Sequence, residues 1–170
     1  MKEKEEIFFK EVQKFGLWLR LLLVFLMMTV VVIECFALIS MLTKPNPPGS
    51  GSVAVLIILG ICLPLILCVL FWMVKLVTEV RLGGLYVRFF PFHLRFQRIP
   101  VEDLQKYYAQ TYQPIKEYGG WGIRYSFGLK SKAYNTSGNR GVQFIFNDGR
   151  KLLIGSQRPD ELVDAIRSIM

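Results

Sequence analysis

Charged residues are almost absent from one long stretch of the sequence. Between Leu21 and Val74 the only charged residues are Glu34 and Lys44. The chain also has little histidine and cysteine, with one His and three Cys in 170 residues. The uncharged stretch excludes a soluble enzyme of ordinary composition and a disordered tail, and the low cysteine content excludes a disulfide-stapled secreted domain. We therefore expect an integral membrane protein with a soluble half.

Two apolar runs are each long enough to cross a bilayer. Residues 53–74 contain 22 residues without a charge, and about 20 residues of helix span a hydrocarbon core of about 30 Å. Residues 17–42 are also apolar, apart from Arg20, Glu34 and a few small polar side chains. The segment between them, residues 43–52, is rich in proline and glycine, which break helices. We expect a transmembrane hairpin made of a helix over 17–42, an extracytoplasmic loop over 43–52 and a helix over 53–75.

Lysine and arginine residues near the ends of the two runs set the expected orientation. Five of them precede or begin the first run, whereas the expected loop contains only Lys44. Lys75, Arg81 and Arg88 follow the second run. Because positively charged residues near membrane spans stay in the cytoplasm, we expect a multi-pass protein with both termini cytoplasmic. The first apolar run is longer than the core of a signal peptide and has no small-residue cleavage site, which argues against a cleaved leader.

The segment before the first run, residues 1–16, mixes lysine and glutamate with apolar side chains. Ile7, Phe8, Val12 and Phe15 recur at roughly helical spacing. This spacing predicts a cytoplasmic amphipathic segment, either a helix on the inner leaflet or an extension of the first span. Both alternatives give the segment an anchoring role.

After Val77 the apolar residues alternate with polar ones, as in half-buried β-strands. Gly83 and Gly84 predict a tight turn between the first two strands. A third strand is expected through Leu94 and Phe96. Further strands are expected within residues 104–112, 123–127, 142–146 and 151–154, with residues 128–136 open to either assignment.

The end of the chain has a different pattern. An apolar stripe at helical spacing predicts a C-terminal helix, and it is formed by Leu162, Val163, Ile166 and Ile169. We therefore expect residues 76–170 to form an all-β barrel of about seven antiparallel strands that is capped by a C-terminal α-helix.

Three segments of this half carry a family resemblance. They are residues 84–89 (GLYVRF) leading to 98–104 (RIPVEDL), residues 120–124 (GWGIR), and residues 137–142 (SGNRGV) running to 153–162 (LIGSQRPDEL). With these segments, the stretch from Val77 to the end resembles the bacterial pleckstrin-homology-like (PH-like) domains, which are often fused to a transmembrane hairpin. The resemblance implies two roughly orthogonal β-sheets with a C-terminal helix, in an uncharacterised group of prokaryotic inner-membrane proteins. It implies no reaction, because that family has no catalytic motif to carry over.

Residues suited to catalysis or metal binding are scarce. The single histidine, His93, has no Cys, Asp or Glu at ligand spacing. The three cysteines lie within the apolar runs, where small packing residues are common. No phosphate-binding glycine loop is present. We therefore expect a protein that is not an enzyme and that uses no metal or other cofactor, and we expect no nucleic-acid partner.

The excess positive charge is concentrated after the second run. Residues 75–170 contain 15 Lys and Arg against 8 Asp and Glu. Anionic lipid headgroups attract nearby basic residues by about 1 kcal/mol each. General electrostatic attraction and a specific headgroup pocket both stay open as explanations. The candidate headgroup contacts are Arg81, Arg88 and Arg95 on the outward face of the first three strands, and Lys130, Lys132 and Arg140 as a second cluster in loops.

Two other features predict contacts with proteins. Residues 112–121 are rich in aromatic residues and glycine, which makes Tyr118 and Trp121 candidate interaction residues. Trp121 fits the interior of the domain equally well. Glu34 is an ionisable group deep in the first run and needs a polar partner there. That partner is either another copy or another membrane protein, or a backbone carbonyl near Pro64, whose ring leaves a carbonyl of its helix free.

Taken together, these patterns favour a non-catalytic, membrane-anchored PH-like module for interaction or assembly. Its expected partners are the bilayer and either a second copy of the chain or another membrane protein. The first alternative is a sensor of anionic lipid headgroups that uses a basic strand face. The second alternative is an accessory subunit of a membrane transporter complex, with Glu34 as the intramembrane contact.

Overall fold

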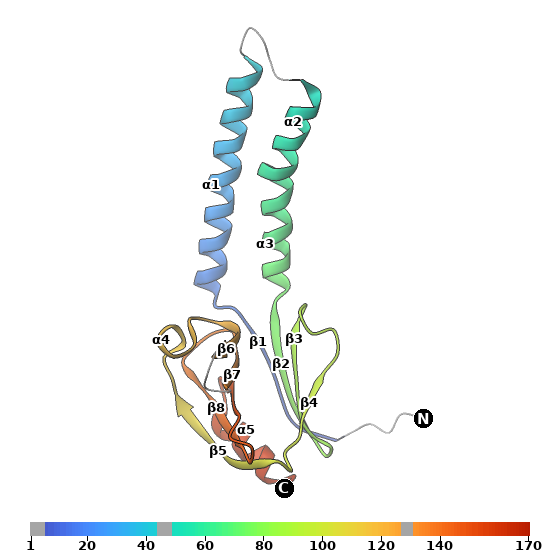
Figure 1. Ribbon diagram of the computed structural model, residues 1–170, viewed down its shortest axis with the longest axis vertical. Coiled ribbons are helices and arrows are strands. Elements are labelled where there is room, and N and C mark those ends of the chain that lie inside the picture. Colours follow the sequence, from blue (N-terminus) through green and yellow to red (C-terminus); the bar gives the residue numbers. More distant parts are fainter. Residues whose placement is uncertain (1–5, 44–48, 127–130) are drawn as a thin grey trace, which may run out of the picture. The chain divides into compact units, whose positions relative to one another are not determined.

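The computed structural model describes residues 6–43, 49–126 and 131–170, and the chain divides into a helical unit and a β unit (Figure 1). The helical unit is Leu17–Met73. The β unit combines Met1–Gly16 with Val74–Met170. The N-terminal segment therefore belongs with the C-terminal half, although the whole helical unit separates them in the sequence.

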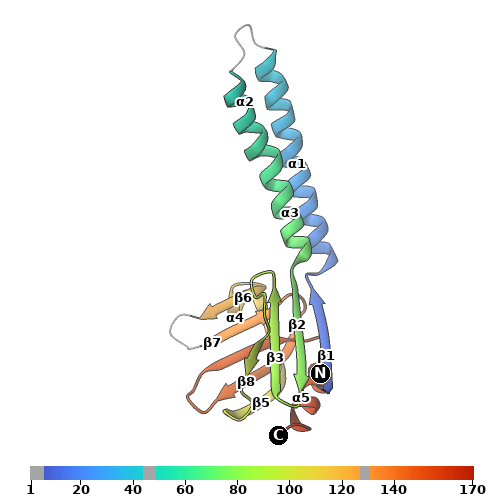
Figure 2. The ribbon, with the colours of Figure 1, turned by 90° about the vertical axis from the view of Figure 1, so that its right-hand side faces the viewer.

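Two helical stretches lie side by side in the helical unit (Figures 1 and 2). The first is α1, Leu17–Leu42, and the second consists of α2 (Ser50–Ile57), the π-helical turn η1 (Ile58–Cys62) and α3 (Leu63–Met73). Residues 17–42 and 51–73 form two helices that are long and apolar enough to cross a membrane. No residue of α1 is buried, so its apolar side chains are free to contact lipid.

Strand β1, Ile7–Lys14, occupies the segment in which we expected an amphipathic helix, so that expectation is wrong. The strand pairs antiparallel with β2, Lys75–Arg81, and Figure 2 shows the two side by side. Alternate side chains of β1 are buried, namely Phe9, Glu11 and Gln13. The buried side therefore includes two polar residues, while the apolar Val12 is exposed. A distant strand supplies the backbone hydrogen bonds that decide the conformation of the segment.

The first sheet has four strands in the order β1-β2-β3-β4. Strand β3 is Gly84–Phe90, and β4 is only Gln97–Ile99. The third strand that we expected through Leu94 is therefore wrong over most of its length. Pro91 ends the preceding strand, and Leu94 is 75% exposed in a bend. Leu94 alternates with polar residues in the sequence, but no side of this segment is buried as in a strand.

The second sheet has five strands in the order β5-β8-β9-β7-β6. Their bounds are Leu104–Thr111 (β5), Gly122–Ser126 (β6), Ser131–Asn135 (β7), Arg140–Phe146 (β8) and Lys151–Gly155 (β9). Neighbouring strands are antiparallel except for β7 and β9, which pair in parallel. The expectation that all strands are antiparallel is therefore wrong for this pair. A short helix, α4 (Pro114–Tyr118), lies in the connection between β5 and β6.

The C-terminal helix α5, Pro159–Arg167, confirms the expected helical end. It packs on β1, β2, β5 and β8, and so on strands of both sheets. The described part of the chain holds nine strands, against the seven or so that the sequence predicts. The core lies between the sheets and the helix, and its fully buried members include Leu76, Val80, Leu85, Val87, Val142, Phe144, Ile154, Leu162 and Ile166.

Candidate functional site

The outward face of the first sheet gathers basic side chains from all four strands. Paired residues of antiparallel strands project to the same side of a sheet. Lys10 pairs with Glu79, which pairs with Tyr86, which pairs with Arg98, so one row crosses the whole sheet. The paired residues on either side of this row add further cations to the same face of the sheet. We call this surface the basic face, and its cations are Lys10, Lys14, Lys75, Arg81, Arg88 and Arg98.

Glu79 is the one carboxylate that these four strands place on the basic face, and it is 2% exposed. Lys10 Nζ lies 2.9 Å from its Oε1, and Arg81 Nε donates to its Oε2 at 3.0 Å. Burial works to raise the pKa of Glu79, but the hydrogen bonds and charges of Arg81 and Lys10 outweigh it and lower the pKa. The carboxylate is therefore ionised at neutral pH and fixes Lys10 and Arg81. A second carboxylate, Glu102 in the turn after β4, lies 2.6 Å from Arg98 Nη2. The remaining three cations of the basic face form no salt bridge with a described carboxylate.

Arg81 and Arg88 share one aromatic ring. Their guanidinium carbons lie 5.0 Å and 4.7 Å from the centre of the Phe96 ring, which is a cation–π geometry. The Nε atom of Arg88 is buried and has no hydrogen-bond partner among the described residues. Two of the three arginines that the sequence assigned to an outward strand face therefore lie together on it.

The third arginine, Arg95, lies in the exposed bend before β4 and not on a strand. The second expected cluster does not form as one group. Lys132 lies opposite Leu152 on the inner side of the second sheet, whereas Arg140 begins β8 and pairs with Asp160 at 2.9 Å. Lys130 lies outside the described residues.

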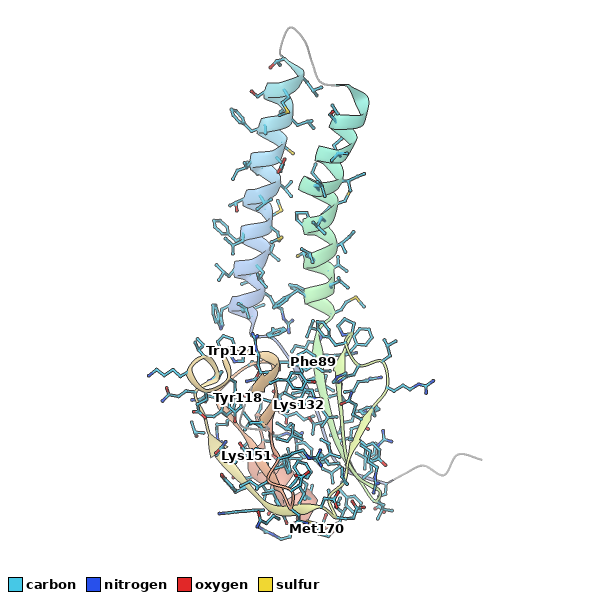
Figure 3. All side chains as sticks on the ribbon, in the orientation of Figure 1. Phe89, Tyr118, Trp121, Lys132, Lys151 and Met170 are labelled. Atoms are coloured by element: carbon cyan, nitrogen blue, oxygen red, sulfur yellow. The ribbon has the colours of Figure 1, made fainter. Side chains whose placement is uncertain are left out.

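Tyr118 and Trp121 both have contacts within the β unit. Tyr118 packs edge-on against Tyr112 at 5.9 Å and partly covers a small cluster of Tyr112, Ala133 and Leu153. Burial raises the pKa of the Tyr118 hydroxyl. Trp121 Nε1 donates to the backbone oxygen of Gly138 at 3.3 Å. Figure 3 labels both residues. Each has a structural contact, and their role in binding a partner stays a prediction.

Glu34 lies against the second helical stretch of its own unit. A Cβ atom built on Gly60 would lie 2.7 Å from the Glu34 Cδ atom, so only glycine leaves room for this side chain. Gly60 belongs to the π-helical turn η1, four residues before Pro64. Because proline has no N–H, the backbone carbonyls one turn before it lose a donor. Glu34 therefore lies beside the turn before Pro64, where the sequence predicts a backbone carbonyl without a hydrogen-bond donor.

The residues suited to metal or acid–base chemistry are dispersed. Within residues 6–43, 49–126 and 131–170, no group of three or more His, Cys, Asp or Glu side chains is arranged to hold a metal ion. His93 packs edge-on against Tyr134 at 5.6 Å, and burial together with the charge of Lys132 lowers its pKa. The histidine is therefore a neutral packing residue at pH 7.

Sequence reasoning missed four members of the basic face. Lys10 and Lys14 were assigned to a helix, and Lys75 and Arg98 were not connected with them. The local sequence carries no strand signal there, because Phe9, Val12 and Phe15 recur three residues apart while the burial of β1 alternates with a period of two. The pairing of β1 with β2 across the helical unit could not be read from spacing.

A family model described as a family of unknown function (DUF6141) matches residues 1–170. No curated protein and no solved structure matches the chain. The chain belongs to this family.

Proposed function

For this member of DUF6141, we propose that the protein is a non-catalytic module anchored in a membrane, and that its basic face binds anionic lipid headgroups. The single observation that carries the proposal is the collection of six cations on one sheet face, three of which form no salt bridge with a described carboxylate. At about 1 kcal/mol for each cation near an anionic surface, several cations acting together give useful affinity.

The chain connections support a lipid partner. Only Phe15 and Gly16 separate β1 from α1, and only Val74 separates α3 from β2. Lys14 and Lys75 pair with each other at that end of the strands. Two cations of the basic face therefore lie within three residues of a proposed membrane span. With the orientation that the positive-inside rule predicts, these residues are cytoplasmic, as expected for the inner membrane of a prokaryote.

The arrangement of the β unit supports a PH-like fold. Two sheets and a C-terminal helix that packs on both agree with the architecture that the sequence resemblance implies. The unit departs from it by having nine described strands and by taking its first strand from before the helical unit. We therefore assign a PH-like role to the unit and place the binding surface on its own basic face.

The assembly module that the sequence favoured has less geometric support. Its interaction residues, Tyr118 and Trp121, have contacts inside the β unit. The transporter-subunit alternative depends on Glu34, which has a contact at Gly60 within its own unit. Lipid binding has more geometric support, because Lys14, Lys75 and Arg88 form no salt bridge with a described carboxylate, whereas Lys10 and Arg81 pair with Glu79 and Arg98 pairs with Glu102.

The test compares lipids that differ only in headgroup charge. Full-length protein in non-ionic detergent is mixed with equal amounts of phosphatidylglycerol and phosphatidylcholine, and bound lipids are counted by native mass spectrometry. We expect phosphatidylglycerol to be preferred, and the preference to weaken at high salt. Lys10→Gln/Arg88→Gln removes two charges from the basic face and keeps Lys14 and Lys75, the two cations nearest the spans in the sequence, and the preference should fall severalfold.

Lys116→Gln/Arg167→Gln is the matched control, because it removes the same charge from exposed residues of α4 and α5. This control should keep the preference of the unmodified chain. Equal retention of both lipids by the unmodified chain, or an unchanged preference in Lys10→Gln/Arg88→Gln, contradicts headgroup binding by this face.

A further inference from the structure

The β unit contains a second candidate site, a cavity of about 590 Å³ between β4 and the inner side of the second sheet. Aromatic and aliphatic side chains from both sheets line it, among them Ile99, Tyr125, Tyr134, Phe146 and Leu152. This volume lies within the range of pockets that hold small ligands, which is about 300–1,000 Å³. Lys132 and Lys151, both labelled in Figure 3, also line it.

Lys132 breaks the apolar pattern of its surroundings. In the sheet register it lies opposite Leu152 on one side and Tyr125 on the other, and the next residue on the same face is Tyr134. Leu152 and Tyr134 are 6% and 2% exposed. A lysine at such an inner position removes a packing side chain and brings a charge into the space between sheets. Violations of this kind are typical of functional positions.

Two tyrosines hold the ammonium group in place. Lys132 Nζ lies 5.0 Å from the centre of the Tyr125 ring and 4.5 Å from that of Tyr134. The Tyr134 hydroxyl donates to Gln97 Oε1 at 3.0 Å, which fixes it across to β4. Burial works to lower the pKa of Lys132, but hydrogen bonds with Tyr134 and Tyr125 outweigh it and raise the pKa. The lysine is therefore charged at neutral pH.

The cavity lacks a matching negative charge. Its lining holds three further cations, Arg98, Arg150 and Lys151, and one carboxylate, Asp148. Asp148 accepts hydrogen bonds from the side chain and backbone of Arg150. In the described part of the chain, Lys132 forms a salt bridge with no carboxylate. A charged group in a partly dry site without a counter-ion is suited to an anion from outside.

We propose that this cavity binds an amphiphilic anion, with a carboxylate or phosphate on Lys132 and an apolar body against Tyr125, Phe146 and Leu152. The mixture of an apolar lining with one fixed cation favours such a molecule over inorganic phosphate, which would leave the lining in contact with water. The anion comes either from solution or from a membrane lipid, since both present the same chemistry. The site lies apart from the basic face, with which it shares only Arg98.

The test uses 2-naphthoate as the anionic probe and 2-naphthamide as its neutral isostere. Full-length protein is placed in nanodiscs of phosphatidylcholine, and binding is measured by calorimetry against empty nanodiscs. We expect the dissociation constant of 2-naphthoate to be at least about tenfold lower than that of 2-naphthamide, as for one charge-assisted hydrogen bond of about 1.5–3 kcal/mol. Equal affinity for the two probes overturns the proposal.

Lys132→Met keeps the length of the side chain and removes the ammonium group, so the tenfold preference should disappear. Lys106→Met is the matched control, because Lys106 also lies over a tyrosine ring of the second sheet, that of Tyr108 at 5.1 Å, but does not line the cavity. Lys132→Arg should restore the preference, which separates loss of charge from loss of folding. A preference that survives in Lys132→Met overturns the proposal.

A second arm identifies the source of the anion. Nanodiscs that contain phosphatidylglycerol at constant ionic strength should weaken 2-naphthoate binding if a membrane lipid occupies the cavity, and should leave it unchanged if the natural ligand is soluble. Both results support the site. Lys10→Gln/Arg88→Gln should bind 2-naphthoate normally, so failure of this site and failure of the basic face are distinguishable.

Discussion

In the β unit most of the large apolar side chains lie inside, and in the helical unit most of them lie outside. Phe144 of β8 is fully buried between the sheets, whereas Phe36 of α1 is 76% exposed. The carboxylates of the two units also have different contacts. Glu79 is fixed by two cations, and Glu34 lies against Gly60 with no described cation beside it. The difference is the one expected if the proposed membrane anchor is correct, with lipid around the helical unit and water around the β unit.

The largest expected effect comes from truncating each phenylalanine. Phe144→Ala should destabilise the β unit by about 3–5 kcal/mol, because it removes buried contacts and leaves a cavity. Phe36→Ala should change the stability of the helical unit by less than about 1 kcal/mol in a bilayer, because lipid replaces the lost contacts. Hydrogen exchange of the full chain in nanodiscs measures both. A large effect of Phe36→Ala would mean that α1 packs on protein and not on lipid.

The next effect concerns the attachment of β1. The Glu11 carboxylate is 8% exposed and accepts hydrogen bonds from Ser156 Oγ at 2.6 Å and from the Gln157 N–H at 2.8 Å. Glu11→Ala leaves these donors unpaired, and we expect a cost of about 2–3 kcal/mol in the opening free energy of β1. Val12→Ala, on the exposed side of the same strand, is the control. Equal exchange rates in the two variants would show that Glu11 does not hold the strand.

The same strand shows how far the sequence can be interpreted. The two apolar helices, most strands after Val77 and the C-terminal helix follow from local periodicity, and the structure has them. Strand β1 does not follow, because its hydrogen-bond partners on β2 and its side-chain partners at Ser156 and Gln157 lie far away in the sequence. The polar and apolar residues of this segment do not alternate, so its local pattern favours a helix and only its distant partners reveal a strand.

The candidate site divides in the same way. Arg81 and Arg88 were predicted from alternation within adjacent strands, which is local information. Lys10 and Lys14 join them only through the long-range pairing of β1. Lys132 was predicted to be a loop cation on the surface, but it lies on the inner side of a sheet because β7 pairs in parallel with β9. Parallel neighbours leave no turn signal between them for a sequence to show.

A smaller effect is expected at the contact of Glu34 with Gly60. Gly60→Ala places a methyl group 2.7 Å from Glu34 Cδ and should destabilise the helix pair by about 1–2 kcal/mol. Glu34→Ala in the same chain should remove most of that cost, because it deletes the atoms that the methyl group would contact. A double-mutant cycle in bilayers, with helix association as the readout, measures the coupling. Additive effects of the two substitutions would contradict the contact.

The smallest expected effect is a difference in the pH dependence of stability between a buried ion pair, that of Glu79, and an exposed one, that of Asp164. The pKa of Glu79 is lower in the folded chain than its ordinary value of 4.5, so the folded state binds fewer protons and gains stability above that pH. This stability should be lost as the pH falls from about 4.5 through the folded pKa, and Glu79→Gln should flatten that part of the curve. Asp164 and Arg167 form an ion pair in which both side chains are 69% exposed, so Asp164→Asn should leave the curve nearly unchanged. Thermal unfolding of the full chain in non-ionic detergent between pH 3 and pH 7 makes the comparison. If both variants follow the unmodified chain, burial of Glu79 does not strengthen its ion pairs with Lys10 and Arg81.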